Sequence, residues 1–371
     1  MYCFRIKEPG EGGESACLAP SPPSKAYVIE RLAVTATQPN QSAPAIAIVI
    51  PCYRVSAHIL DVISSIPAWV KGIYAVDDCC PERTADILAS RCHDPRLRIL
   101  RHSNNQGVGG ATCTGYAAAL ADGFEVIVKM DGDGQMDPAF LPRLVHPIIS
   151  RQADFTKGNR LYDLRALRQM PLARRIGNMG LTLLTKAASG SWHISDPTNG
   201  YTAIHQSALR LINLDRLSRR YFFESSTLIQ LNIIRAVAVD VPIPARYGNE
   251  QSSLNIWRAL FGFPPRLLRG LGQRVIWRYF IYDISAVTIL LMAGGMLTFS
   301  GVAFGAYHWV IGALNGQFQS SGTIGIALLL IILGFQMLLQ AVLLDVVDKP
   351  LAPLGNLLRD EAPTLVSRGP S

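Results

Sequence analysis

The sequence predicts an α/β protein with a mostly parallel sheet and helices on both faces, followed by an amphipathic segment and a hairpin of two transmembrane helices. Three observations support this prediction. Short β-branched runs alternate with helical stretches between residues 45 and 254, which is typical of parallel sheets. Polar or glycine-rich turns follow these runs. Two long C-terminal stretches contain no lysine or arginine, and each is long enough to cross a bilayer.

The chain divides into five predicted segments. Residues 1–44 are rich in proline, serine, glycine and alanine without a sustained hydrophobic period, so we expect a disordered tail. This tail lacks the basic start and apolar core of a secretory signal. The α/β domain follows at 45–254, the amphipathic segment at 255–279, the two membrane helices at 280–348 and a second tail at 349–371.

The order of elements in the α/β domain follows from residue type. Apolar runs rich in valine and isoleucine are expected to be buried strands, and the stretches between them to be helices. The predicted strands are at 45–50, 72–76, 97–100 and 126–130. The predicted helices are at 58–66, at 81–91 and from the glycine-rich turn through residue 120.

Two carboxylates, Asp131 and Asp133, follow the strand at 126–130 and are separated by one glycine. A tight turn would direct both beyond the end of the strand. Close carboxylates repel each other unless a cation lies between them. Mg²⁺ or Mn²⁺ prefers oxygen ligands and usually shares coordination with the phosphates of a substrate, and Gln135 could add a neutral oxygen. A polar turn without a metal remains an alternative for this short pattern.

Three further turns fall at the ends of predicted strands. They are Pro51 to Tyr53, the pair Asp77-Asp78, and the glycine-rich turn at 104–111, which includes Gly107. Ligands bind parallel sheets beyond the carboxyl ends of the strands, so one crevice could contain all of these turns. The glycine-rich turn opens a helix, where backbone N–H groups could meet a phosphate. It lacks the G-x-G-x-x-G spacing of dinucleotide-binding folds.

The two apolar stretches at 284–311 and 324–344 are predicted membrane spans. Five glycines within them would be costly in a soluble helix but are ordinary where helices pack in lipid, and they permit homo-oligomer formation. These glycines are Gly294, Gly295, Gly301, Gly305 and Gly334. A buried hairpin of a soluble protein is the alternative.

Arginines before the first span predict the orientation in the membrane. They are Arg258, Arg266, Arg269, Arg274 and Arg278, and such clusters mark the cytoplasmic side. The segment at 255–279 also contains tryptophan, phenylalanine and leucine, so we expect an interfacial helix on anionic lipid that is interrupted at Pro264 and Pro265. The net charge of +8 is then explained by a membrane. No nucleic-acid partner is expected, because the sequence contains no nucleic-acid-binding motif.

In their order along the chain, the four turns resemble those of family 2 glycosyltransferases with a GT-A fold. The closer resemblance is to the polyprenyl-phosphate branch, which includes dolichol-phosphate mannosyltransferases and undecaprenyl-phosphate glucosyltransferases. I-V-I-P-C-Y resembles V-I-P-x-Y, and V-D-D-C-C-P-E-R-T resembles V-D-D-x-S-P-D-G-T. N-N-Q-G-V-G-G-A resembles N-x-G-x-G-x-A, and M-D-G-D-G-Q-M-D-P resembles the metal motif M-D-A-D-x-Q-H-P. The resemblance covers residues 46–254 and extends to the two C-terminal spans.

The resemblance implies roles for individual residues. On the donor side, Pro51, Tyr53 and Asp78 would line the nucleotide pocket, with Asp77 nearby, and Asp131, Asp133 and Gln135 would hold the metal on the diphosphate. On the acceptor side, the implied residues are Arg160, Arg174, Arg175, Asp196, Glu224 and Arg246. Val55 stands where an acidic residue is usual, and Ser253 where a lysine is usual. The acceptor phosphate would therefore depend more on Arg246 and the Arg174-Arg175 pair.

The function implied is inverting transfer of one sugar from a nucleotide sugar to undecaprenyl or dolichyl phosphate, at the cytoplasmic face of a membrane, expected to be a bacterial inner membrane. An ionised phosphate needs positioning by cations rather than a strong base, because its second pKa is near 6. The sequence lacks the Q-x-x-R-W mark of processive synthases, so one sugar per cycle is expected. Two alternatives remain open. One is a transferase with a hydroxyl acceptor, on a glycolipid or saccharide, which would need a base such as Asp196. The other is a non-catalytic membrane protein that binds nucleotide sugars.

Overall fold

The computed structural model of the chain describes residues 44–162, 172–244 and 256–356. At residues 172–176, 178 and 256–261 it describes the backbone but not the side chains. The predicted N-terminal tail, apart from its last residue, and most of the predicted C-terminal tail therefore lie outside the described residues.

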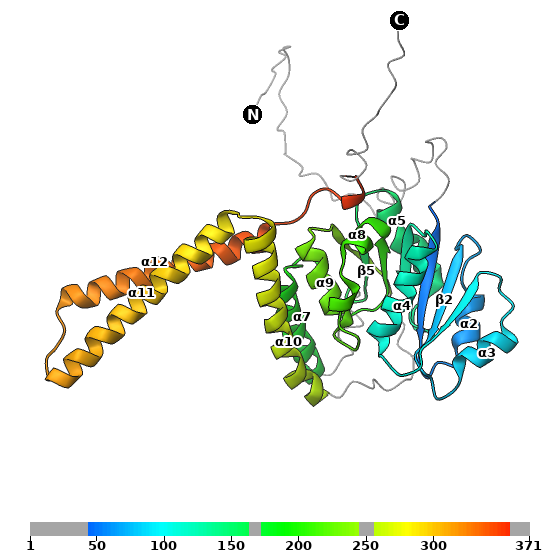
Figure 1. The fold of residues 1–371 in the computed structure, drawn as a ribbon, viewed down its shortest axis with the longest axis horizontal. Coiled ribbons are helices and arrows are strands. Elements are labelled where there is room, and N and C mark those ends of the chain that lie inside the picture. The colour runs from blue at the N-terminus through cyan, green and yellow to red at the C-terminus, as the bar shows by residue number, and fades with distance from the viewer. Residues whose placement is uncertain (1–43, 163–171, 245–255, 357–371) are drawn as a thin grey trace, which may run out of the picture. The chain divides into compact units, whose positions relative to one another are not determined.

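One seven-stranded sheet forms the centre of the α/β region (Figure 1). Its strands are β1 (Ile46–Cys52), β2 (Gly72–Asp77), β3 (Leu97–Arg101), β4 (Val126–Lys129), β5 (Phe155–Asn159), β6 (Thr202–His205) and β7 (Ala238–Pro242). The spatial order is β3-β2-β1-β4-β6-β5-β7. Strand β6 runs antiparallel to β4 and β5, and the other described pairs are parallel. The predicted mostly parallel sheet is confirmed.

Helices cover both faces of this sheet. On one face lie α2 (Ile59–Ser64), α3 (Thr84–Arg91) and α5 (Leu141–Ile149). On the other lie α4 (Val108–Ala121), α8 (Gln206–Leu211) and α9 (Phe223–Ile233). Alternate residues of β1 enter the two cores: Ile48 packs into the first, and Val49 into the second. Burial on both faces explains why β1 is continuously apolar, and each large buried side chain stabilises the fold by about 1.5–3 kcal/mol.

Helix α3 begins at Thr84, three residues after the predicted start at 81. The preceding residues form a turn that Asp77 closes, because its carboxylate accepts the backbone N–H groups of Cys80 and Ala85, each at 2.7 Å. Arg83 occupies the left-handed region at φ 53°. The proline at 81 therefore belongs to the turn that leads into the helix, and not to the helix itself.

The amphipathic segment forms a single helix, α10 (Ile256–Ile276), which continues through Pro264 and Pro265. The prediction of an interruption there is wrong. A proline inside a helix removes a backbone hydrogen bond, but here Phe263 and Leu267 pack against α9 and α7 (Leu172–Ser189). This apolar contact holds the chain helical on both sides of the prolines. A π-helical turn, η3 (Trp277–Tyr282), follows α10.

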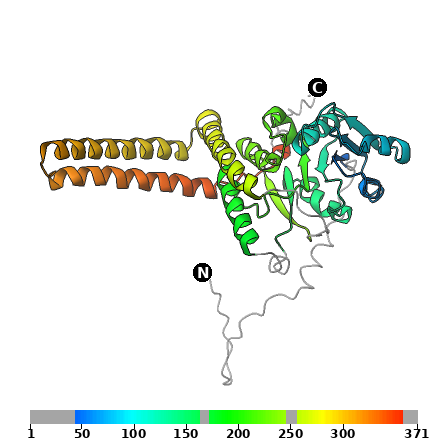
Figure 2. The same ribbon diagram turned by 90° about the horizontal axis from the view of Figure 1, so that it is seen from below.

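Two long apolar helices, α11 (Ala286–Asn315) and α12 (Ser321–Val347), lie side by side where the membrane spans are predicted (Figure 2). Their length and composition allow each to cross a membrane. Only 22% and 17% of their most apolar windows are buried, whereas a hairpin in a soluble core would be mostly covered. The helices approach closely at Gly294, where an added Cβ would lie 2.9 Å from the carbonyl oxygen of Gly334.

Two arginines of the amphipathic segment are buried in ion pairs with the end of the second apolar helix. The guanidinium of Arg274 contacts both oxygens of Asp345, at 2.6 and 2.8 Å, and Arg278 contacts Asp348 at 2.6 Å. The prediction that the arginines lie on lipid is therefore wrong for Arg274 and Arg278. Buried guanidinium groups require charged partners, and these two connect α10 and η3 to the end of α12.

Candidate active site

Three chain segments bring charged residues to one edge of the sheet. Strand β4 ends at Lys129 and leads to Asp131, and β5 ends at Asn159 just before Arg160. Because β6 is antiparallel, the loop that precedes it, which carries Asp196, lies at the edge where β4 and β5 end. This edge is the usual ligand site of such sheets. The structure thus brings Asp131, Arg160 and Asp196 to one side of the molecule.

Asp131 is held by a buried lysine that the sequence analysis did not identify. The Nζ atom of Lys129 lies 2.8 Å from Asp131 and 3.3 Å from Glu224, and Lys129 is only 1% exposed. Burial alone would lower the pKa of this amine, but the carboxylates of Asp131 and Glu224 prevail and raise the pKa of Lys129 above its usual range. A lysine within an otherwise apolar strand was the available signal. Lys129 fixes Asp131 and Glu224 as one charged cluster.

The turn after β4 carries the carboxylates of Asp131 and Asp133 and the side-chain amide of Gln135. The backbone N–H of Gln135 donates to Asp133 at 3.0 Å, and Gly134 takes φ +76°, which closes the turn. The second oxygen of Asp131 lies beside Gly200, where an added Cβ would come within 2.9 Å of it. Within the described residues, no group of three histidine, cysteine, aspartate or glutamate side chains could enclose a metal. Carboxylate and amide oxygens are the ligand types of hard ions such as Mg²⁺, which usually complete their coordination with water and phosphate oxygens.

Arg160 and Asp196 form a two-point ion pair across this edge. The Arg160 Nε atom lies 2.8 Å from one Asp196 oxygen and a terminal nitrogen lies 3.3 Å from the other, while Thr198 donates its hydroxyl to Asp196 at 3.1 Å. Asp196 is 2% exposed. Burial raises the pKa of a carboxyl group, but the hydrogen bonds and charge of Arg160 outweigh it and lower the pKa of Asp196. Asp196 is therefore a weak base that orients a guanidinium.

The loop that carries Asp196 is fastened to β5 by buried polar contacts. Lys157 donates from its Nζ atom to the carbonyl of Asn199, and the side-chain amide of Asn199 donates to the carbonyl of Gly158 at 2.6 Å. The backbone N–H of Tyr201 donates to the Asn199 side chain at 3.1 Å. Burial lowers the pKa of Lys157 to about 8. These residues were missed by the sequence analysis, because their partners lie about 40 residues away.

The predicted nucleotide-side residues differ in exposure. Tyr53 follows β1 and is 43% exposed, and the guanidinium of Arg54 lies over its ring, 5.5 Å from the centroid. Pro51, within β1, is partly buried. Asp77 and Asp78 are buried, and the carboxylate of Asp77 closes the turn before α3. Tyr53 is thus the most accessible of these four residues, while Asp77 supports the turn before α3.

The glycine-rich turn is held by protein groups. Asp78 accepts the backbone N–H groups of Gln106 at 2.8 Å and Gly107 at 2.7 Å, and the N–H of Gly110 donates to the carbonyl of Arg219 at 3.0 Å. The prediction that these N–H groups meet a phosphate is therefore wrong for Gln106, Gly107 and Gly110. The glycines allow the turn to approach the segment at 218–220 closely, a neighbour that residue type alone does not reveal.

Replacing Gly107 with alanine is expected to destabilise the fold more than replacing Gly123. Both glycines have positive φ, +88° and +83°, so each alanine costs about 1–3 kcal/mol in backbone strain, and Gly107, with ψ 166°, lies in a region that essentially only glycine adopts. An alanine Cβ at 107 would also lie 2.5 Å from the Arg219 carbonyl, whereas at 123 nothing lies within 4 Å. Melting temperatures of the two variants measure the difference. Equal melting temperatures would show that the contact with Arg219 is unimportant.

The structure does not describe the side chains of three predicted acceptor-side residues. Arg246 lies outside the described residues. Arg174 and Arg175 fall in the first turn of α7, where only the backbone is described.

Comparisons with known proteins give consistent matches. Residues 47–212 match the family described as Glycosyl transferase family 2. The chain is 27% identical over 232 residues to the UDP-N-acetylglucosamine–dolichyl-phosphate N-acetylglucosaminyltransferase of Methanococcus voltae, covering 59% of this chain and 92% of that protein. It is 31% identical over 173 residues to the undecaprenyl-phosphate mannosyltransferase of Micrococcus luteus, covering 46% and 70%.

Among solved structures, the chain is similar to glucosyl-3-phosphoglycerate synthase from Mycobacterium tuberculosis, crystallised with Mn²⁺, uridine diphosphate and glucosyl-3-phosphoglycerate. The TM-score is 0.47 and the sequence identity is 17%, and the match covers 65% of this chain and 86% of that chain.

Proposed function

The chain belongs to glycosyl transferase family 2, and from this membership we propose that it transfers one sugar from a nucleotide-sugar donor to a polyprenyl phosphate. The main support is that Asp131 and the Arg160–Asp196 pair lie at the same edge of the sheet. A carboxylate suited to a metal–diphosphate group and a guanidinium suited to a phosphate are the two groups that this reaction needs. The names of the relatives, which specify dolichyl and undecaprenyl phosphate, support the acceptor class.

On the donor side, we propose that Asp131 and Asp133, with Gln135, hold Mg²⁺ or Mn²⁺ against the diphosphate. When bound, such an ion supplies Lewis-acid stabilisation of the negative charge on the leaving diphosphate. Lys129 pairs with Asp131 at 2.8 Å and fixes its orientation. Pro51 and Tyr53 lie at the end of β1, where the nucleotide would bind.

On the acceptor side, cations position a phosphate that is already ionised near neutral pH. Arg160 presents a guanidinium whose orientation is fixed by Asp196, and guanidinium forks match phosphate oxygens. Arg174, Arg175 and Arg246 are proposed to complete this cationic group. The acceptor oxygen attacks the sugar from the face opposite the leaving diphosphate, so the anomeric configuration inverts. No protein base is needed for this step.

The C-terminal helices support a membrane arrangement. We propose that α11 and α12 span the membrane, with α10 at its cytoplasmic surface and the α/β domain in the cytoplasm of a bacterium. This arrangement keeps the sugar-transfer edge on the side where nucleotide sugars are made, and it brings a lipid-borne acceptor within reach.

A direct test supplies membranes containing the full chain with a panel of labelled nucleotide sugars and either undecaprenyl or dolichyl phosphate. One labelled sugar is expected to enter an organic-extractable lipid, and chelation of divalent ions is expected to stop the incorporation. Label that enters only neutral glycolipids or saccharides would contradict the proposed acceptor. Donor binding without transfer to any acceptor would instead indicate a non-catalytic binding protein.

The pH dependence distinguishes a phosphate acceptor from a hydroxyl acceptor. Transfer is expected to decline below about pH 6, because the acceptor phosphate then gains a proton. Asp196 remains ionised in that range, since Arg160 lowers its pKa, so it does not set the decline. Replacing Asp196 with asparagine is expected to raise the KM for the acceptor, because Arg160 loses its partner, while the decline stays near pH 6. The measurement is the pH profile of kcat/KM.

The ion pair between Asp196 and Arg160 is expected to stabilise the fold over a pH range that the lowered pKa of Asp196 sets. Because the folded-state pKa of Asp196 is lowered, its ion pair with Arg160 stabilises the fold at neutral pH and is lost only as the pH falls through that lowered value.

If Asp196→Asn abolished turnover while donor binding persisted, Asp196 would be a catalytic base, and a hydroxyl acceptor would replace the one proposed.

A further inference from the structure

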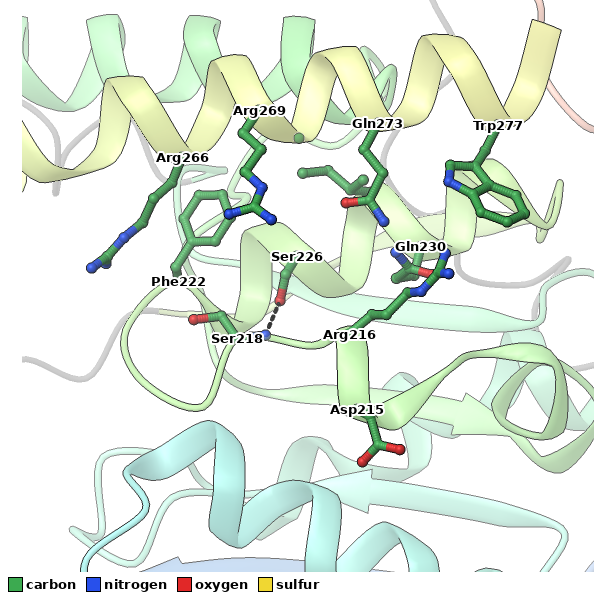
Figure 3. Close-up of a pocket in the computed structure, with 12 residues that line it drawn as sticks. Asp215, Arg216, Ser218, Phe222, Ser226, Gln230, Arg266, Arg269, Gln273 and Trp277 are labelled. Carbon is green, nitrogen blue, oxygen red and sulfur yellow. Dashed lines mark hydrogen bonds between the residues drawn. The ribbon is translucent and has the colours of Figure 1, made fainter. Parts of the chain in front are cut away.

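A cavity of about 640 Å³ lies between α9, α10 and the 3₁₀ turn η2 (Leu214–Arg216), as Figure 3 shows. It is separate from the candidate active site. Ser226 and Gln230 of α9 line the cavity, whereas Glu224 of the same helix contacts Lys129. Successive helical residues are rotated by about 100°, so Glu224 and Ser226 face nearly opposite directions. The cavity and the active-site edge therefore use different sides of α9.

Three arginines border this cavity, namely Arg216 of η2 and Arg266 and Arg269 of α10. All three are exposed. The guanidinium of Arg216 lies over the ring of Trp277, 4.6 Å from the centroid, which holds it in place. Asp215 also lines the cavity, but its carboxylate points away from α10 in Figure 3. The cavity is therefore strongly cationic on the α10 side.

Part of the cavity lining is apolar. It includes Phe222, which immediately precedes α9, Ile229 of α9 and Gly270 of α10. An added Cβ at Gly270 would lie 2.5 Å from the side chain of Ile229, so the absence of a side chain there keeps the two helices close. A ligand that suits this cavity has an anionic group next to an apolar part.

Two exposed apolar side chains of α10 lie near the arginines of the cavity along the helix. Leu268 and Ile276 are 67% and 54% exposed, while Leu267 is buried against neighbouring helices. Ile276 is seven residues after Arg269, so the two point to nearly the same side of the helix. A membrane surface that contacts Leu268 and Ile276 would meet Arg269 and the mouth of the cavity. Trp277 is also a residue type that favours the membrane interface.

We propose that this cavity binds the phosphate head group of an anionic phospholipid, as a site distinct from the acceptor site. Arg216 and Arg269 bind the phosphate oxygens through charge-assisted hydrogen bonds. The first part of the acyl region rests on Phe222 and Ile229. The negative surface of the cytoplasmic leaflet supplies the ligand. Occupancy fixes α10 and α9 against the bilayer, and the site needs no sugar transfer to function.

The test is native mass spectrometry of the full chain in detergent, titrated with phosphatidylglycerol or phosphatidylcholine. In the double variant Arg216→Gln/Arg269→Gln, the apparent Kd for phosphatidylglycerol is expected to rise about tenfold or more, because both guanidinium groups that bind the phosphate oxygens are lost. The weaker binding of phosphatidylcholine is expected to stay unchanged. The matched control is Arg91→Gln/Arg143→Gln, which removes the same charge from exposed positions on α3 and α5 and is expected to leave both affinities unchanged.

Three outcomes would overturn the proposal. Equal losses in the test and control variants would mean that net charge, and not this cavity, attracts the lipid. One-for-one displacement of phosphatidylglycerol by undecaprenyl phosphate would assign the cavity to the acceptor. Full competition by inorganic phosphate at millimolar concentration would indicate an anion site without lipid preference. If the double variant does not fold, as judged by its melting temperature, Arg269→Gln alone provides the same comparison, since Arg269 is exposed.

Discussion

Asp133→Asn is expected to lower kcat by about 10²–10³-fold, the range measured when one group that stabilises transition-state charge is removed. Asparagine keeps the size of the side chain and can still accept the N–H of Gln135, which lies 3.0 Å from Asp133. The turn should therefore fold normally, while the negative charge that would hold a divalent ion is lost. The measurement is the initial rate of sugar transfer over a range of Mg²⁺ and Mn²⁺ concentrations, where the half-saturating metal concentration should rise.

Asp133 is preferred to Asp131 for this experiment because Asp131 also pairs with Lys129, so its replacement would change stability as well as chemistry. The matched control is Asp61→Asn on α2, an exposed aspartate outside the acidic turn, which should transfer sugar at the wild-type rate. A second readout is donor binding by calorimetry with and without Mg²⁺. Wild-type turnover and an unchanged metal requirement in Asp133→Asn would contradict the proposed metal site.

Lys129→Met is expected to lower the free energy of unfolding by about 3–5 kcal/mol, the cost of removing one partner from a buried ion pair. The methionine fills a similar volume, but the carboxylates of Asp131 and Glu224, which lie 2.8 and 3.3 Å from Nζ, would be left without their shared cation. For a domain of this size the loss corresponds to a decrease in melting temperature of roughly 6–20 °C. Intrinsic tryptophan fluorescence of the detergent-solubilised chain during heating measures it.

Two companion variants make the result specific to this charge cluster. Adding Glu224→Gln to Lys129→Met should recover part of the lost stability, because one of the two unpaired carboxylates is then neutral. Lys71→Met, at an exposed position before β2, should change stability by less than about 0.5 kcal/mol. A wild-type melting temperature for Lys129→Met would show that Lys129 is not needed to hold Asp131 and Glu224 together.

Several predictions from the sequence were accurate because they depended on local pattern. The strand at 126–130 was expected from its apolar residues, and β4 is present there at Val126–Lys129. The two long apolar stretches form α11 and α12. The buried strand and the long apolar helices are apolar along their whole length, whichever segments they contact. Composition and length are therefore sufficient to identify them.

Other predictions failed where a residue type has two possible uses. Glycines 107 and 110 could expose N–H groups to a phosphate or allow another segment to approach, and in the structure Asp78 and Arg219 occupy those N–H groups. Arg274 could face lipid or form a buried ion pair, and in the structure it pairs with Asp345. In each case the deciding partner is distant in the sequence, so no local pattern reveals it.

Hydrophobic pattern and turn residues were enough to predict the first four strands with the helices between them, the acidic turn after β4 and the apolar hairpin, because these features depend on neighbours within a few residues. Folding in three dimensions decided which charges meet. Lys129 reaches Glu224 across 95 residues and Arg160 reaches Asp196 across 36, and the second contact forms at the active-site edge because β6 is antiparallel. The direction of β6 and the packing of α9 on the sheet determine these contacts, and both are decided only when the whole domain is folded.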